Sequence, residues 1–203
     1  MSQVLQFDPP AAAGPSETPP HRRIRWASRA LSVLFGVVLL AEILLAALVA
    51  ASFFADIPGV IVSIGRSGMA LTFGADTAPK GYVTVASLPL VHRLAHVAMG
   101  LVVVPPGLLI FWNLRRLFRL YGQGVVFSEA NARCIKFVGA GLAANAIAPL
   151  ISVSTLSALH MVVDHRWFHD DTLQQLVLGG VLYVIAQVME VGRQIEEEQG
   201  QFV

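Results

Sequence analysis

Four long apolar stretches constrain the fold of this chain more than any other feature of its sequence. Each is long enough to cross a hydrocarbon core of roughly 30 Å, because an α-helix rises about 1.5 Å per residue. Inside a lipid core, backbone polar groups are satisfied only in helices or closed barrels. The sequence therefore predicts an all-α membrane protein, an antiparallel bundle of four spans at residues 30–54, 87–114, 136–159 and 172–190.

The composition agrees with a membrane protein and argues against a soluble enzyme. Charged residues make up 13 % of the 203 residues and apolar residues 55 %, whereas soluble domains carry about 25 % charged residues. The single cysteine, Cys134, excludes an intramolecular disulfide and a multi-cysteine metal site. No phosphate-binding loop, dinucleotide fingerprint or nucleophile elbow is present. We therefore expect a protein that is not an enzyme and needs no cofactor.

The remaining segments divide the chain into three predicted parts. Residues 1–24, which begin with a stretch rich in Pro, Ala, Gly and Ser, are expected to form a disordered cytoplasmic tail. Residues 25–195 form the membrane domain, and residues 196–203 form a cytoplasmic C-terminal tail. A cleaved signal peptide is the alternative for the first span, but the apolar run is too long for one.

The connection between the first two spans is predicted to form a small β-hairpin outside the cytoplasm. Apolar residues alternate at Val60, Val62 and Ile64, and a glycine-rich turn follows at residues 65–68. Residues 70–72 continue the pattern as the second strand. A third strand is expected at residues 81–86.

The distribution of positive charge predicts the orientation of the spans. Cytoplasmic flanks of membrane spans carry an excess of Lys and Arg. Only four of these residues belong to the other side: Arg66, Lys80 and Arg166 in the loops, and Arg93 at the boundary of the second span. We therefore predict a multi-pass protein of the bacterial inner membrane with both termini in the cytoplasm. The cytoplasmic positive residues are Arg22, Arg23, Arg25, Arg29, Arg115, Arg116, Arg119, Arg133, Lys136 and Arg193.

Among the polar residues inside the predicted spans, two are candidates for a functional site. Glu42 lies near the middle of the first span and Asn145 lies in the third. A carboxyl group at such a depth is costly, so it is a candidate for a proton or ligand site facing Asn145 or His96. The alternative is a protonated glutamate that makes one hydrogen bond between helices. A role in small-solute or proton transport would depend on Glu42.

Two histidine pairs suggest a metal site on the outer side. Residues four apart share one face of a helix, as His92 and His96 do. His165 and His169 have the same spacing beside acidic residues, and such ligands suit zinc, copper or nickel. The alternative is four interfacial histidines without a ligand. A haem with His96 as an axial ligand is a further alternative, which would need His160 or His165 as the second ligand.

The cytoplasmic segments contain residues suited to binding a protein partner. Neither segment contains a catalytic constellation, so partner binding is the natural functional role; basic residues beside spans also contact anionic lipid. The candidate residues are Arg115, Arg116, Arg119, Glu196, Glu197 and Glu198. We expect the lipid bilayer as a partner, a homo-oligomer as a further association, and no direct binding of nucleic acid.

The segment between the second and third spans resembles the central motif of a known family. The motif is a basic amphipathic segment, then Gly-x-x-Phe, a small hydroxyl residue, an acid, x and Asn, and then a basic helix that ends in Gly. The resemblance is to DUF 2975, a family of four-helix bacterial membrane proteins, and it covers about residues 25–203, including the C-terminal segment 192–203. The matching positions are Gly124, Phe127, Ser128, Glu129, Asn131, Arg133 and Gly139.

This resemblance carries an expectation about function. The family has no established biochemical activity, and its members are often encoded beside a small helix-turn-helix regulator of the Xre/Cro type. The resemblance therefore implies a membrane component of a regulatory pair. In that arrangement the loop 115–135 and the tail 190–203 would bind the regulator, and a signal from the bilayer or the outer side would alter that binding.

Overall fold

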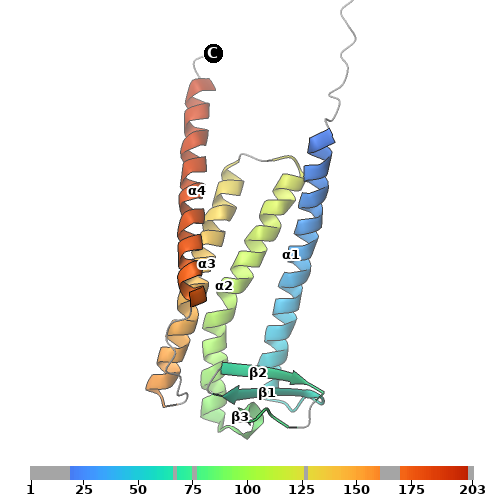
Figure 1. Ribbon diagram of the computed structural model, residues 1–203, viewed down its shortest axis with the longest axis vertical. Helices are drawn as coiled ribbons and strands as arrows, with labels where there is room; N and C mark the ends of the chain where they lie inside the picture. Colours follow the sequence, from blue (N-terminus) through green and yellow to red (C-terminus); the bar gives the residue numbers. More distant parts are fainter. Residues whose placement is uncertain (1–18, 66–67, 75–76, 126–127, 161–169, 201–203) are drawn as a thin grey trace, which may run out of the picture.

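Four long helices lie side by side, with a small β-sheet at one end (Figure 1). The computed structural model describes residues 19–65, 68–74, 77–125, 128–160 and 170–200. All four helices are long and apolar enough to cross a membrane. The first helix begins and the last helix ends at one end of the molecule, the termini end, and the β-sheet lies at the opposite end, the sheet end. The helices are α1 (Pro19–Ser52), α2 (Leu90–Gly122), α3 (Glu129–Ala158) and α4 (Asp170–Gly200).

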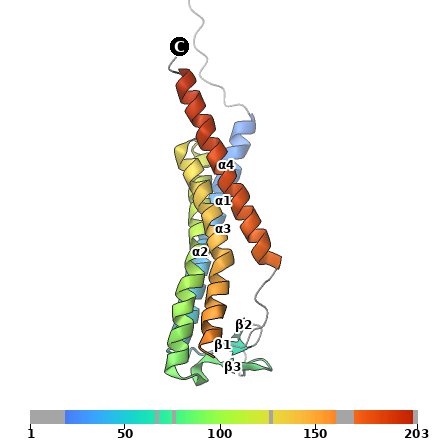
Figure 2. The same cartoon turned by 90° about the vertical axis from the view of Figure 1, so that its left-hand side faces the viewer.

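The main contacts between helices follow the order of the chain. Helix α1 packs on α2, α2 on α3, and α3 on α4. Figure 2 shows α4 crossing α3 at an angle, with the beginning of α4 pointing away from the other helices. Most of the apolar side chains on α1 and α4 point outward and are exposed. The expected antiparallel order of the helices is confirmed, and the helices are arranged as successive pairs.

The helices extend beyond the predicted spans at their charged ends. Helix α1 begins at Pro19, within the segment 1–24 expected to be a tail, and residues 1–18 of that tail lie outside the described residues. Proline is well tolerated in the first turn of a helix because its missing N–H has no partner there. Helix α4 continues to Gly200, through residues 196–200. Arg, Gln and Glu are good helix formers, so the helix does not stop where the apolar residues end.

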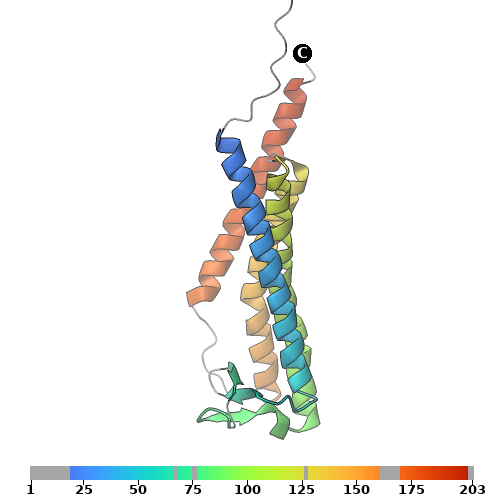
Figure 3. The same cartoon turned by 90° about the vertical axis from the view of Figure 1, so that its right-hand side faces the viewer.

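The predicted hairpin and third strand are present at the sheet end. Strand β1 (Val60–Gly65) pairs antiparallel with β2 (Gly68–Phe73) on one side and with β3 (Tyr82–Thr84) on the other. A short 3₁₀ turn, η1 (Val85–Ser87), follows. Figure 3 shows the sheet beneath the ends of α1 and α2. The inward side chains Phe53, Val62 and Val85 form a small core that joins the sheet to α1.

Arg93 fastens the first turn of α2 to the segments around it. Its Nε donates to the carbonyl of Leu88 at 2.8 Å, and its Nη1 donates to the carbonyl of Phe53 at 3.4 Å. Its Nη2 donates to the carbonyl of Ala86. One guanidinium therefore satisfies carbonyls at the end of α1 and in the loop before α2. This use explains why a charged residue lies at the predicted boundary of the second span.

Helices α3 and α4 make their closest contact at two glycines. A Cβ atom on Gly139 would lie 2.7 Å from the carbonyl oxygen of Gly179, and a Cβ on Gly179 would lie 2.7 Å from the carbonyl oxygen of Gly139. Small residues allow two backbones to approach in this way. The Nζ of Lys136 lies 5.5 Å from the centre of the Tyr183 ring, on the termini side of the glycine contact. The crossing therefore depends on the absence of side chains at both glycines.

We predict that Gly139→Leu forces α3 and α4 apart, since the new side chain would meet the α4 backbone. The expected loss of stability is about 1–3 kcal/mol, which is typical for overpacking. It should appear as a lower midpoint of thermal unfolding of the purified protein in detergent. Gly180→Leu is the matched control, because a Cβ there has no neighbour within 4 Å. Equal midpoints for the two variants would contradict the glycine contact.

Candidate functional site

The turn between α2 and α3 is built by a glycine in the left-handed conformation. Gln123 follows the last residue of α2, and the next residue, Gly124, has φ +82°. Residues that carry a side chain rarely adopt this backbone conformation, so glycine suits the position. The N–H of Val125 then donates to the carbonyl of Leu120 at 3.1 Å, which closes the end of the helix. The glycine of the sequence motif is therefore explained by backbone geometry.

The first turn of α3 is held by two more motif residues. Ser128 caps the helix, and its Oγ accepts a hydrogen bond from the N–H of Asn131 at 3.3 Å. Asn131 is fully buried, and its Nδ2 donates to the carbonyl of Val125 at 2.8 Å. Glu129 and Arg133 form an exposed ion pair one turn apart, at 2.5 Å. A serine followed by an acidic residue is typical of a helix start, and these motif residues hold the turn in place.

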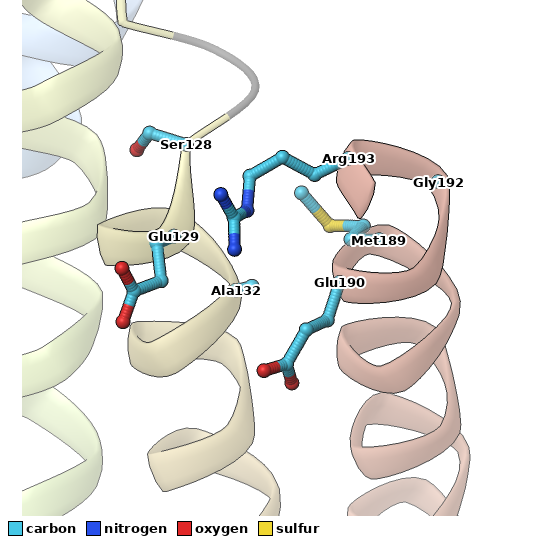
Figure 4. Close-up of a pocket in the computed structure, with 7 residues that line it drawn as sticks. All are labelled: Ser128, Glu129, Ala132, Met189, Glu190, Gly192 and Arg193. Atoms are coloured by element: carbon cyan, nitrogen blue, oxygen red, sulfur yellow. The ribbon is translucent and has the colours of Figure 1, made fainter. Parts of the chain in front are cut away.

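A cavity of about 180 Å³ lies between the first turn of α3 and the termini half of α4. In Figure 4, the Arg193 side chain reaches from α4 toward Ser128, and Glu190 extends beside α3. Ala132 and Met189 contribute an apolar wall. Side chains of both charges therefore surround a small opening that is part apolar and part polar. The complete lining consists of Ser128, Glu129, Ala132, Met189, Glu190, Gly192 and Arg193.

Sequence reasoning did not identify Glu190 and Arg193 as site residues. Glu190 ends the last predicted span and Arg193 lies in the cytoplasmic flank after it. Both fall within the tail 190–203 expected to bind a regulator, but neither belongs to a recognisable motif. The available signal was their spacing of three, which places both on one helix face with Met189. That this face points at the start of α3 follows from the crossing at Gly139, which the sequence does not specify.

The predicted arginine cluster occupies one face of α2 near the termini end. Trp112, Arg115, Arg116 and Arg119 surround a shallow hollow of about 340 Å³. The spacing of three, four and seven residues explains why they share a face. Arg115 also contacts α1, because a Cβ on Gly36 would lie 3.2 Å from its Nε. Arg116 and Arg119 are exposed to solvent.

The acidic residues predicted to bind a partner lie on the last part of α4. The helix includes residues 196–200. For Glu196, Glu197 and Glu198 the structure describes the helical backbone but not the side chains. Since Met189, Glu190 and Arg193 already flank the first turn of α3, this last part of α4 extends past that turn, as Figure 1 shows. The structure therefore brings the arginine cluster and the end of α4 to the same end of the molecule.

The two polar residues of the predicted spans do not face each other. Asn145 on α3 donates through Nδ2 to the Oε1 of Gln175 on α4 at 3.1 Å. Glu42 lies on an exposed face of α1, and within the described part of the chain it makes no hydrogen bond or ion pair. It lines a groove between α1 and α2 together with His96. Of the two expected neighbours of Glu42, only His96 lines the same groove, and it does so at the other end.

The predicted outer histidines are only partly described. His92 and His96 lie in the first two turns of α2, and the Nδ1 of His96 bonds to the carbonyl of His92 at 2.7 Å. His96 is 9 % exposed and stacks on Phe53 with ring centres 6.3 Å apart. His165 and His169 lie outside the described residues. Within the described ranges, no group of three or more His, Cys, Asp or Glu side chains is gathered as a metal site would require; the four-histidine site stays a prediction.

The fold and these sites define a class of small helical proteins whose four apolar helices suggest a multi-pass membrane protein. The chain belongs to the family described as "Protein of unknown function (DUF2975)", which matches residues 74–201. This match confirms the resemblance drawn from the motif around Gly124 and Asn131. Comparisons with curated proteins and with solved structures find no match.

We predict that Asn131→Ala loosens the turn between α2 and α3. The substitution removes the bond to the carbonyl of Val125, and losing a buried hydrogen bond costs about 1–3 kcal/mol. The control is Asn113→Ala, because Asn113 is also buried but donates only to Leu109 within its own helix. Thermal unfolding in detergent should show the larger fall in midpoint for Asn131→Ala. A larger fall for the control would contradict the role assigned to Asn131.

Proposed function

We propose that this protein is an integral protein of the bacterial cytoplasmic membrane, with both termini in the cytoplasm. The exposed apolar side chains on the helices support this proposal, since a soluble protein rarely exposes such a continuous surface. The positive residues support the orientation. Arg29, Arg115, Arg119, Arg133 and Arg193 come from four different helices, and all lie toward the termini end. An excess of positive residues is typical of the cytoplasmic side.

Within the membrane, the protein acts by binding rather than by catalysis. It is the membrane member of a regulatory pair, and its cytoplasmic end binds a small helix-turn-helix regulator. The observation that carries this proposal is the convergence at one end of the arginine cluster, the cavity beside Arg193 and the last turns of α4. These features offer an exposed charged surface next to an apolar opening, which suits a protein partner. The regulator, and not this chain, would contact DNA.

A signal in the bilayer or on the outer side would change this surface by shifting the helices. A ligand shifts such an equilibrium only by its difference in affinity for the two arrangements. Helix α4 could respond to such a signal by turning about the crossing at Gly139 and Gly179, where the two backbones lie close together. A small rotation there would change the distance between Arg193 and the first turn of α3.

We expect a small helix-turn-helix protein to be recovered when the tagged protein is crosslinked in cells and purified in mild detergent. Arg116→Gln combined with Arg119→Gln should reduce its recovery about tenfold, as for the loss of one or two charge-assisted contacts. All three arginines are exposed, but Arg115 also contacts α1 beside Gly36 and is therefore left unchanged. Quantitative mass spectrometry of the purified complexes is the measurement.

Lys80→Gln is the matched control, because Lys80 is exposed in the loop at the sheet end. It should leave recovery of the regulator unchanged. If only membrane enzymes or transport subunits are recovered, the regulatory proposal is wrong. If the double arginine variant recovers as much regulator as the unmodified protein, Arg116 and Arg119 are not part of the binding surface.

A further inference from the structure

A groove of about 410 Å³ runs between α1 and α2 toward the sheet end. Its walls are almost entirely apolar, with Val49 on α1, Phe53 just after it, and Val97, Leu101 and Val104 on α2. Small residues keep it open: Gly100 lines it, and a Cβ there would have no neighbour within 4 Å. Such a size and lining suit a small apolar molecule.

The groove contains two polar side chains, one at each end. Phe53 stacks on His96, which places these two residues at the same level. Glu42 precedes Phe53 by eleven positions on α1, a rise of about 16 Å along the helix. The walls between the two levels are apolar. A molecule lying along the groove would therefore meet a carboxyl group at one end and an imidazole at the other.

His96, which lines the groove, has an unused nitrogen just beneath its surface. The side chain is buried, and its Nδ1 lies 2.7 Å from the carbonyl of His92, an acceptor that requires a proton on Nδ1. In the neutral ring, Nε2 then carries a lone pair. Nε2 is buried and has no hydrogen-bond partner within the described residues. A buried polar atom without a partner is uncommon, and a hydrogen-bond donor on a ligand would satisfy it.

The other polar groups along the groove are also acceptors. Glu42 has no partner among the described residues, although a carboxyl group exposed on an apolar helix is costly. Leu101 lines the groove, and its carbonyl lacks the usual helical donor because Pro105 has no N–H. The groove thus offers acceptors and one acid, without a cationic side chain in its lining. Its complement is an apolar molecule that carries positive charge and N–H or O–H donors.

We propose that the groove between α1 and α2 is a binding site for a lipophilic amine. The ammonium group pairs with Glu42 and the apolar body lies along the walls past Gly100. A small shift of the His96 ring uncovers Nε2 for a second donor group on the ligand. This site does not depend on the regulator-binding proposal, because it lies toward the opposite end of the helices. The two proposals can therefore fail separately.

The charge is tested with dodecylammonium and its uncharged analogue dodecanol, added to the purified full-length protein in nanodiscs. We expect one dodecylammonium to bind per chain, and dodecanol to bind at least about tenfold more weakly, because an ion pair is lost. Glu42→Gln should weaken dodecylammonium binding by a similar factor. Asp171→Asn is the matched control, since Asp171 is an exposed acid outside the groove. Isothermal titration measures the affinities. Equal affinities for the two probes, or unchanged binding by Glu42→Gln, would overturn the proposal.

The volume of the groove is tested with Gly100→Leu, which fills the open space beside Gly100 without displacing protein atoms that lie near its Cβ. It should abolish binding of dodecylammonium, whereas Gly180→Leu, at an equally open glycine outside the groove, should not. Helical content and a monodisperse elution profile confirm that each variant is folded. Binding retained by a folded Gly100→Leu protein would place the ligand elsewhere and contradict the proposal.

The second donor is tested with 12-aminododecanol, which adds a hydroxyl group to the far end of dodecylamine. It should bind several-fold more tightly than dodecylammonium to the unmodified protein, since the hydroxyl satisfies Nε2 of His96. In His96→Phe, which keeps the ring stacked on Phe53, this gain should vanish. A gain that persists in His96→Phe would overturn the role of His96.

Discussion

The structure depends on one constraint, which is that an apolar segment must satisfy its own backbone hydrogen bonds. A helix does this within a single segment, so each apolar stretch forms a long helix. The side chains can then point outward in all directions without leaving backbone groups exposed. The elements that break this rule lie at the ends of the helices. There, the sheet, the capped turn at Ser128 and the guanidinium of Arg93 supply partners for free carbonyls and N–H groups.

The few polar side chains inside the helices follow the same constraint. Asn113 and Ser154 bond to carbonyls of their own helices, and Asn145 bonds to Gln175 on the neighbouring helix. Glu42, the Nε2 of His96 and the Nδ1 of His92 are different, because no group in the described chain satisfies them. Glu42 and His96 line the same groove, which is why we propose a ligand there.

Much of the fold could be predicted from the sequence, because the signals are local. The length of each apolar stretch predicted a helix, and the alternation at Val60, Val62 and Ile64 predicted the hairpin. The serine and the acidic residue at the start of α3 are likewise typical of the first turn of a helix. The ends of α1 and α4 were harder, since polar residues such as those of 196–200 favour a helix and a solvated tail alike.

The lateral packing could not be predicted, and this is why the sites were only partly found. A helix that is apolar on all sides carries no pattern that shows which face meets a neighbour. The small residues near Gly139 were recognisable, but not their contact with Gly179. Without that crossing, the position of Arg193 beside α3 could not be inferred. In the same way, Glu42 was singled out by its type, whereas the groove that it shares with His96 required the structure.

The central claim is that the four helices cross a bilayer with both termini on the cytoplasmic side, and cysteine labelling tests it most directly. The background is Cys134→Ala, which removes the native thiol. Lys80→Cys lies at the sheet end and Gly200→Cys at the termini end. With a membrane-impermeant maleimide applied to cells whose outer barrier is permeabilised, Lys80→Cys should be labelled at once. Gly200→Cys should be labelled only after the cells are opened. The reverse pattern would contradict the orientation, and labelling of both positions in unopened cells would contradict a location of the two ends on opposite sides of the membrane.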